Sequence, residues 1–140
     1  MQNEVVKELN EFLKGQYMGI HSYEQYIQKL EDATIKRQFQ EIQQGHKEHA
    51  MKVAKRIQNL GGEPVDDEGL IKSAQGFINQ LNLPDTTEGL IKGAIKGETL
   101  GIEMSERIVR GDLDEESLEL INEILDHDRQ HTNLLKRLLH

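Results

Sequence analysis

The sequence predicts an all-α fold, a four-helix bundle built from two antiparallel helical hairpins joined by a long crossover. The first observation is that apolar residues recur at steps of three, four and seven through four long stretches, which is the period of one helix face. The second is an internal repeat, because the chain matches itself after a gapless shift of 128 − 46 = 82 residues. The shift aligns three pairs of polar residues, namely Gln16 with Glu98, His46 with Asp128, and His49 with His131. Together these observations predict a duplicated hairpin with polar side chains in its interior.

A first helix is predicted over about residues 3–31. Asn3 is a suitable N-cap, and an apolar stripe follows it as far as Leu30. Gln16 and Tyr23 lie on this stripe because they are two helical turns apart. We interpret Gln16 as an inward polar group and Tyr23 as a core residue whose hydroxyl lies near the site.

A second helix is predicted over about residues 34–60, antiparallel to the first because the connection between them is short. Its inward stripe contains His46 and His49, which are one turn apart and therefore share a face. The helix is expected to end at Gly61, which can adopt a left-handed cap, and Pro64 prevents continuation. Both imidazoles are therefore predicted to face the interior.

The second hairpin is predicted to contain helices over about 86–110 and 114–139. Glu98 lies among apolar neighbours on the first of these helices. Asp128 and His131 lie on the apolar stripe of the second, again one turn apart. All three side chains are expected to face the same interior as the two histidines of the first hairpin.

We expect a single domain over residues 1–140, with the crossover over about 61–85. A short helix within the crossover would use Leu70, Ile71, Ala74, Phe77, Ile78 and Leu81.

The chain has no cysteine, which excludes disulfides and thiolate metal sites. Its net charge of −8, with basic residues dispersed among acids, argues against a nucleic-acid partner. The chain shows neither a signal peptide nor a membrane span, so we expect a soluble, cytoplasmic protein without a membrane partner.

Six polar groups are thus predicted to meet inside one bundle: Gln16, His46, His49, Glu98, Asp128 and His131. Buried charges without partners are costly, and a metal ion would compensate them. Imidazole nitrogen and carboxylate oxygen suit iron, manganese or zinc. The alternative is a dry network in which these side chains hydrogen-bond one another. Among the other histidines, His21 is predicted to be solvated, and His127 to be a boundary residue or an outer partner of the ligands.

These motifs resemble the ferritin-like superfamily, and bacterioferritin most closely. The resemblance covers nearly the whole chain and is carried by Leu9–Leu13, Leu60–Pro64 and Glu123–His131. The family's helices carry Glu, Glu-x-x-His, Glu and Glu-x-x-His as ligands to a di-iron centre. Residue by residue, the resemblance implies that these six residues are the metal ligands. Gln16 and His46 stand where the family has carboxylates, and Asp128 keeps a carboxylate on a shorter side chain.

The substitutions change what the resemblance implies. Two carboxylates offset only one divalent ion, so a second ion should bind more weakly, and His46 removes the bridging carboxylate expected between two ions. A single-metal site with His46, His49, His131 and a carboxylate is therefore the alternative to a di-metal site. Lys47 stands where bacterioferritin has its haem-ligating methionine, so no haem is implied.

The first functional hypothesis is a protein that binds one or two non-haem metal ions, iron in particular, with ferrous-ion oxidation as its enzymatic activity. The second is a non-enzymatic, ferritin-fold protein with a degenerate or absent metal site, acting in stress protection or assembly. The third is a rubrerythrin-like peroxide reductase, which without cysteine would need a separate electron donor. The resemblance also implies a homodimer or larger homo-oligomer, but not a closed iron-storage shell.

Overall fold

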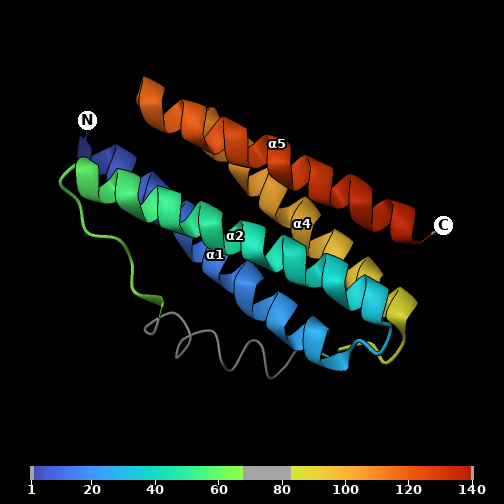
Figure 1. The fold of residues 1–140 in the computed structure, drawn as a ribbon. Coiled ribbons are helices and arrows are strands. Elements are labelled where there is room, and N and C mark those ends of the chain that lie inside the picture. The colour runs from blue at the N-terminus through green and yellow to red at the C-terminus, as the bar shows by residue number, and fades with distance from the viewer. Residues whose placement is uncertain (1, 68–82, 140) are drawn as a thin grey trace.

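The computed structural model describes residues 2–67 and 83–139, which form a bundle of long helices (Figure 1). In these ranges the helices are α1 (Gln2–Lys29), α2 (Ala33–Asn59), α4 (Thr87–Val109) and α5 (Glu115–Leu138). Helix α1 packs mainly on α2, and α4 packs mainly on α5. The predicted all-α four-helix bundle is confirmed. The six apolar residues considered for a crossover helix lie outside the described residues.

The two helices of each hairpin run in opposite directions, whereas α2 and α4 run in the same direction (Figure 1). Helices α1 and α5 run one way, and α2 and α4 run the other, so both hairpins are antiparallel. Helix α2 ends at one end of the bundle and α4 begins at the opposite end. The two hairpins therefore meet along their whole length, which allows residues far apart in sequence to share one interior.

Side-chain caps explain where three of the helices begin. The N-caps are Asp32 for α2, Thr86 for α4 and Asp114 for α5. Each side chain accepts a hydrogen bond from the backbone N–H three residues later, at 3.0, 3.0 and 3.4 Å respectively. After α2, Gly61 has φ of +83°, a left-handed conformation that ends the helix. Helix α1 ends at Lys29 rather than near residue 31, because Asp32 already caps the next helix.

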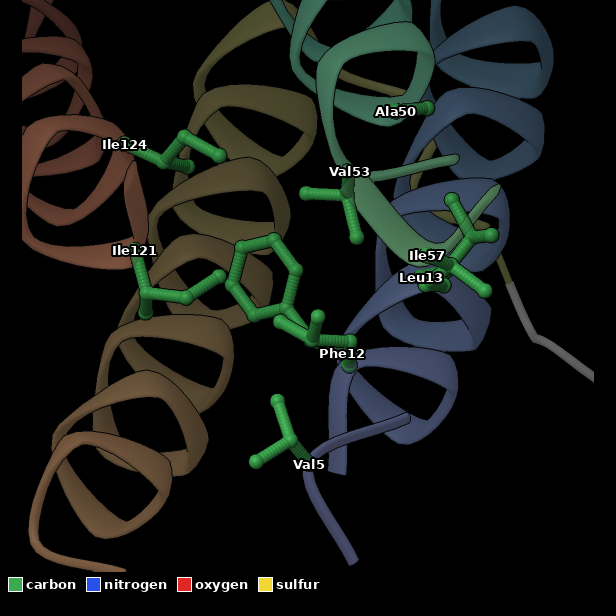
Figure 2. Packing of buried hydrophobic residues seen from close by; sticks show 9 residues of the cluster. Val5, Phe12, Leu13, Ala50, Val53, Ile57, Ile121 and Ile124 are labelled. Atoms are coloured by element: carbon green, nitrogen blue, oxygen red, sulfur yellow. The ribbon is translucent and has the colours of Figure 1, made fainter. Parts of the chain in front are cut away.

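The apolar core forms two clusters, one toward each end of the bundle. The first consists of Val5, Leu9, Phe12, Leu13, Ala50, Val53, Ile57, Ile121 and Ile124. Figure 2 shows Phe12 of α1 projecting between the α1–α2 hairpin and Ile121 of α5. The second cluster consists of Tyr23, Ile27, Leu30, Phe39, Ile42, Leu90, Ile91, Ala94 and Leu135. Burial of these side chains supplies the main stabilisation of the fold.

The candidate site lies between these two clusters. On α1, Gln16 falls between Leu13 of the first cluster and Tyr23 of the second. On α2, His46 and His49 fall between the two clusters in the same way. The interior is therefore apolar, polar and apolar in turn along the bundle axis. Within residues 2–67 and 83–139, no helix combines the length and apolarity that crossing a lipid bilayer requires.

Candidate metal centre

The six predicted ligands come from all four helices and meet in the middle of the bundle. Five of them are buried, with 3–7% of each residue exposed, and these are Gln16, His46, His49, Glu98 and Asp128. The sixth, His131, keeps 19% of its side chain exposed. The sequence therefore identified side chains that the fold does bring into one polar layer, while their role as metal ligands remains a prediction.

His46 is at the centre of this layer. Its Nε2 lies 2.7 Å from Glu98 Oε1, and its Nδ1 lies 3.1 Å from Gln16 Oε1. The same Nδ1 is 3.7 Å from Asp128 Oδ1. The imidazole on α2 thus contacts oxygen atoms from each of the other three helices.

Tyr23 supports the carboxylate that His46 contacts. Its hydroxyl donates a hydrogen bond of 2.7 Å to Glu98 Oε1, the same oxygen that faces His46 Nε2. Burial, together with the charge of Glu98, raises the pKa of Tyr23 well above its ordinary value, so the hydroxyl stays protonated and remains a donor. The sequence placed this hydroxyl near the site but did not identify its partner.

The pKa shifts divide the polar layer into charged and neutral groups. Burial would lower the pKa of His46, but the hydrogen bond and charge of Glu98 outweigh it and raise that pKa. Burial would raise the pKa of Glu98, but the hydrogen bonds from His46 and Tyr23 lower it, so the two groups tend toward an ion pair. Burial raises the pKa of Asp128. Burial also lowers the pKa of His49 to about 3, which makes this imidazole neutral at neutral pH.

Four of these residues have the arrangement that a metal ion requires. One ligand atom from each of four side chains lies within 4.8 Å of the other three, and the residues are His46, Glu98, Asp128 and His131. They come from α2, α4 and α5. Two imidazoles and two carboxylates suit a borderline divalent ion such as iron, manganese or zinc.

Unpartnered buried atoms in the layer test whether a metal ion fits. Among the described residues, His49 Nδ1, Asp128 Oδ1 and His131 Nδ1 are buried and have no hydrogen-bond partner. Asp128 Oδ1 and His131 Nδ1 are 3.6 Å apart, too far for a hydrogen bond. Leaving such groups unsatisfied is costly, and a cation bound between Asp128 and His131 would satisfy the lone pairs of these two atoms. The residues present therefore fit a metal ion.

Gln16 and His49 lie beside this four-residue group rather than within it. Gln16 contacts the group only through His46. The ring of His49 lies 6.3 Å from the ring of His46 and 6.4 Å from that of His131, centroid to centroid. On its outer side, His49 Nε2 is 3.0 Å from Nδ1 of His127.

The 82-residue repeat places a glycine and a histidine at equivalent positions, since 45 + 82 = 127. A Cβ on Gly45 would lie 3.3 Å from Cε1 and 3.5 Å from Nε2 of His131, so this glycine gives the ring room against α2. His127 occupies the equivalent place beside His49. Gly45 in the first hairpin therefore faces His131 in the second, and His127 in the second hairpin faces His49 in the first.

The structure refines the predictions for two histidines. His127, predicted to be a boundary residue or an outer partner of the ligands, contacts His49, and its spacing of four residues from His131 places both on one face of α5. His21, predicted to be solvated, keeps 24% of its side chain exposed, and its Nε2 lies 2.9 Å from Asp67 Oδ1. That carboxylate lies after α2, in a segment whose path the helical pattern did not predict.

Comparison with known proteins places this geometry in context. A family model described as a domain of unknown function (DUF2383) matches residues 4–111. No curated protein sequence matches the chain significantly.

Several solved structures share the fold at low sequence identity. A Mycobacterium smegmatis Dps1 mutant superposes with a TM-score of 0.86 at 16% identity, covering 99% of this chain and 97% of that one. A dodecameric thioferritin from Bacteroides fragilis, described as bacterioferritin-related, gives 0.79 at 19% identity, covering 99% and 86%. A ferritin-like, diiron-carboxylate protein from Bacillus anthracis gives 0.74 at 21% identity, covering 99% and 97%. These neighbours confirm the ferritin-like fold expected from the sequence.

Proposed function

The chain belongs to the family described as a domain of unknown function (DUF2383), within the ferritin-like superfamily, and from its polar layer we propose that it binds a divalent metal ion, iron in particular. The proposed ligands are His46, Glu98, Asp128 and His131. The observation that carries the proposal is the pair of unpartnered buried atoms, Asp128 Oδ1 and His131 Nδ1, within this group.

The distances within the group support one shared ion. In tetrahedral coordination, metal–ligand bonds of about 2.0–2.2 Å hold neighbouring ligand atoms roughly 3.3–3.6 Å apart. The His46 to Glu98 distance of 2.7 Å and the Asp128 to His131 distance of 3.6 Å bracket this range. Four-fold coordination would therefore require His46 and Glu98 to move apart, and any pair near the 4.8 Å limit of the group to move closer.

The charges also support one ion at this position. Glu98 and Asp128 together carry −2 when ionised, which offsets one divalent cation. Binding would replace the proton that His46 shares with Glu98, so the ion takes over the role of that proton as the partner of a buried carboxylate. Gln16 and His49 add neutral donors beside the group and no further charge.

We propose that this site oxidises ferrous ion to ferric ion, with dioxygen or hydrogen peroxide accepting the electrons. Bound iron would supply one-electron redox chemistry, and the chain's own residues hold the ion, keep its surroundings dry and fix the carboxylate orientation through Tyr23. The Bacillus anthracis neighbour is described as a diiron-carboxylate protein, which favours iron over manganese or zinc for this chain.

A second candidate is a bundle without metal that acts through its surface. The observation in its favour is that both ring nitrogens of His46 already face oxygen acceptors, so part of the polar layer is satisfied without an ion. The three unpartnered atoms count against it.

The test is ferrous-ion binding by untagged, metal-free protein, first without oxygen and then with oxygen or hydrogen peroxide as oxidant. We expect saturable binding, followed by a ferric band in the near ultraviolet that grows faster than in buffer. Faster oxidation by peroxide than by oxygen would favour the peroxide reductase.

Glu98→Gln should weaken ferrous binding by about 10–100-fold or more. Glu103→Gln, an exposed position on the same helix, is the matched control. Equal binding by wild type and Glu98→Gln would overturn the proposed site.

We also propose that the chain assembles as a homo-oligomer. The Bacteroides fragilis neighbour is described as dodecameric. Met51 and Leu100 are 72% and 58% exposed on α2 and α4, as apolar contacts between copies would require. Light scattering of the purified protein tests this, and a mass of 16.1 kDa would contradict it.

A further inference from the structure

His49 and His127 form a pair of imidazoles at the edge of the proposed metal site. His49 is buried, with 4% of the residue exposed, and its Nε2 lies 3.0 Å from Nδ1 of His127. The rings are nearly parallel, at 18° with centroids 5.2 Å apart. The other nitrogen of the buried ring, His49 Nδ1, has no partner among the described residues.

The hydrogen bond between the two rings permits only two arrangements when both are neutral. If His49 Nε2 carries the proton, it donates to His127, and His49 Nδ1 presents a lone pair. If His127 Nδ1 carries the proton, His49 Nδ1 must carry a proton as well, and this buried N–H then has no acceptor. A cation can satisfy a buried lone pair but not a buried N–H, so only the first arrangement makes His49 a ligand.

The internal repeat indicates where His49 Nδ1 faces. The equivalent residue, His131, has Nδ1 3.6 Å from Asp128 Oδ1 inside the proposed site, while its Nε2 edge faces Gly45. In His49 the Nε2 edge faces His127, which is the repeat equivalent of Gly45. The two nitrogens of an imidazole point in roughly opposite directions, so His49 Nδ1 points away from His127 and toward the polar layer.

We propose that His127 is a positioning residue that accepts a hydrogen bond from His49 Nε2–H and so presents the His49 Nδ1 lone pair to a second divalent cation beside the first. This inference rests on the proposed metal site and extends it. Gly45 cannot make the equivalent bond to His131, so only one of the two repeat-related histidines is fixed in this way. The ligand that this arrangement offers at the second position is an imidazole nitrogen, His49 Nδ1. We therefore expect this position to prefer nitrogen-seeking ions such as Co²⁺ and Zn²⁺.

The first measurement uses the wild type and needs no variant. Nitrogen-15 NMR of histidine-labelled, metal-free protein distinguishes the two tautomers of each ring. We expect His49 to be protonated at Nε2 and not at Nδ1. A proton on Nδ1 of His49 would overturn the inference whatever the metal content of the protein.

The second measurement is titration with Co²⁺, followed by its visible absorption. We expect two equivalents in wild type, and in His127→Phe a second equivalent that is lost or weakened by about 10–100-fold, with the first unchanged. His127→Gln keeps an acceptor oxygen and should restore the second equivalent, which a purely structural role for the ring would not predict. His21→Gln, a histidine paired on the outer side of α1, is the matched control and should bind like wild type.

The outcomes separate this inference from the proposed function. In one outcome, Glu98→Gln loses the first equivalent of Co²⁺ while His127→Phe keeps the second equivalent unchanged. This result would support the four-residue site and overturn only the role proposed for His127. An unchanged first equivalent in Glu98→Gln would overturn the four-residue site, while the His49 tautomer still decides the role of His127. Binding of a single ion by wild type would overturn the second cation position. Helicity measured by circular dichroism verifies that each variant is folded.

Discussion

His46 shows how one substitution changes the centre of a bundle. Where the ferritin-like pattern has a carboxylate, this chain has an imidazole whose two nitrogens face Glu98 and Gln16. The raised pKa of His46 and the lowered pKa of Glu98 indicate an internal ion pair. A proton on His46 can therefore partly replace a metal ion as the partner of the Glu98 carboxylate.

Tyr23→Phe should destabilise the metal-free protein by about 1–2 kcal/mol, because a buried carboxylate loses one of its two hydrogen-bond donors. Unfolding by urea measures the change. Tyr26→Phe is the control, because Tyr26 packs edge-on against Tyr23 but its hydroxyl lies beside Gly93. Equal effects of the two substitutions would show that the Glu98 hydrogen bond contributes no special stability.

At this scale the sequence could predict which residues face inward but not what they contact. Helical spacing was sufficient to place His46, His49 and His131 on inner faces. The contact between His49 and His127, and the hydrogen bond from Tyr23, depend on side-chain rotamers and on the approach of helices distant in sequence. Periodicity contains neither kind of information.

The helices have clear starts and stops because local chemistry defines them. The end of α2 predicted at Gly61 is formed in the structure, whereas Asn3, the N-cap expected from the sequence, lies inside α1, and the caps Asp32, Thr86 and Asp114 were identified only in the structure. Residues 61–85 lack such signals, and the prediction of a crossover there rests on the weakness of the helical pattern. Local signals therefore predict helix ends better than they predict long connections.

Gly61→Ala should destabilise the protein by about 1–2 kcal/mol, because a Cβ is strained at φ of +83°. Gly97→Ala is a matched change inside α4, where a Cβ would meet nothing within 4 Å. It should stabilise the helix by about 0.5–1 kcal/mol. Chemical denaturation of both variants checks the prediction, and a shift of the same sign in the two would contradict it.

Asp114→Asn should lower stability at pH 7, although asparagine is an equally good N-cap, because the charge facing Arg56 at 2.6 Å is lost. Burial would raise the pKa of Asp114, but hydrogen bonds from Ser117 and Arg56 outweigh it and lower the pKa. A lowered folded pKa gives stability that is present above the unfolded pKa of about 3.9 and is lost as the pH falls through the folded value.

The wild type should therefore exceed Asp114→Asn in stability by up to about 1 kcal/mol at pH 7, a modest value because the group is partly exposed. The difference should vanish near pH 2. Thermal unfolding from pH 7 to pH 2 measures it. Asp112→Asn, at an exposed position in the same turn, is the matched control, and a difference between wild type and Asp114→Asn that grows as the pH falls would contradict the assignment.

On the scale of the whole molecule, the repeat predicts more symmetry than the structure has. The shift of 82 residues makes His49 and His131 equivalent. Yet His131 lies within the four-residue group, whereas His49 lies beside it and contacts His127. The asymmetry comes from one pair of positions, Gly45 and His127, whose side chains differ in size and chemistry. Duplication thus predicted the architecture of the interior but not which of its polar side chains form the four-residue group.

Metal binding should stabilise the folded molecule as a whole, because the proposed ligands join α2, α4 and α5. With free Zn²⁺ at 100 times its dissociation constant, we expect about 2.7 kcal/mol and a rise in Tm of roughly 8 °C. Calorimetry with and without Zn²⁺ measures the shift. Asp128→Asn should lose most of it, and Mg²⁺, which prefers oxygen ligands, should have little effect on the wild type. An equal rise with both ions would indicate weak surface binding.

The two apolar clusters each draw side chains from three or four helices, on either side of the polar layer. Apolar packing therefore stabilises both ends of the bundle independently of the polar layer between them. We therefore expect single substitutions in the polar layer to change the proposed metal binding without unfolding the bundle. This separation explains how a ferritin-like chain can exchange two carboxylates for Gln16 and His46 and still fold, and it makes the protein a suitable starting point for redesigned metal selectivity.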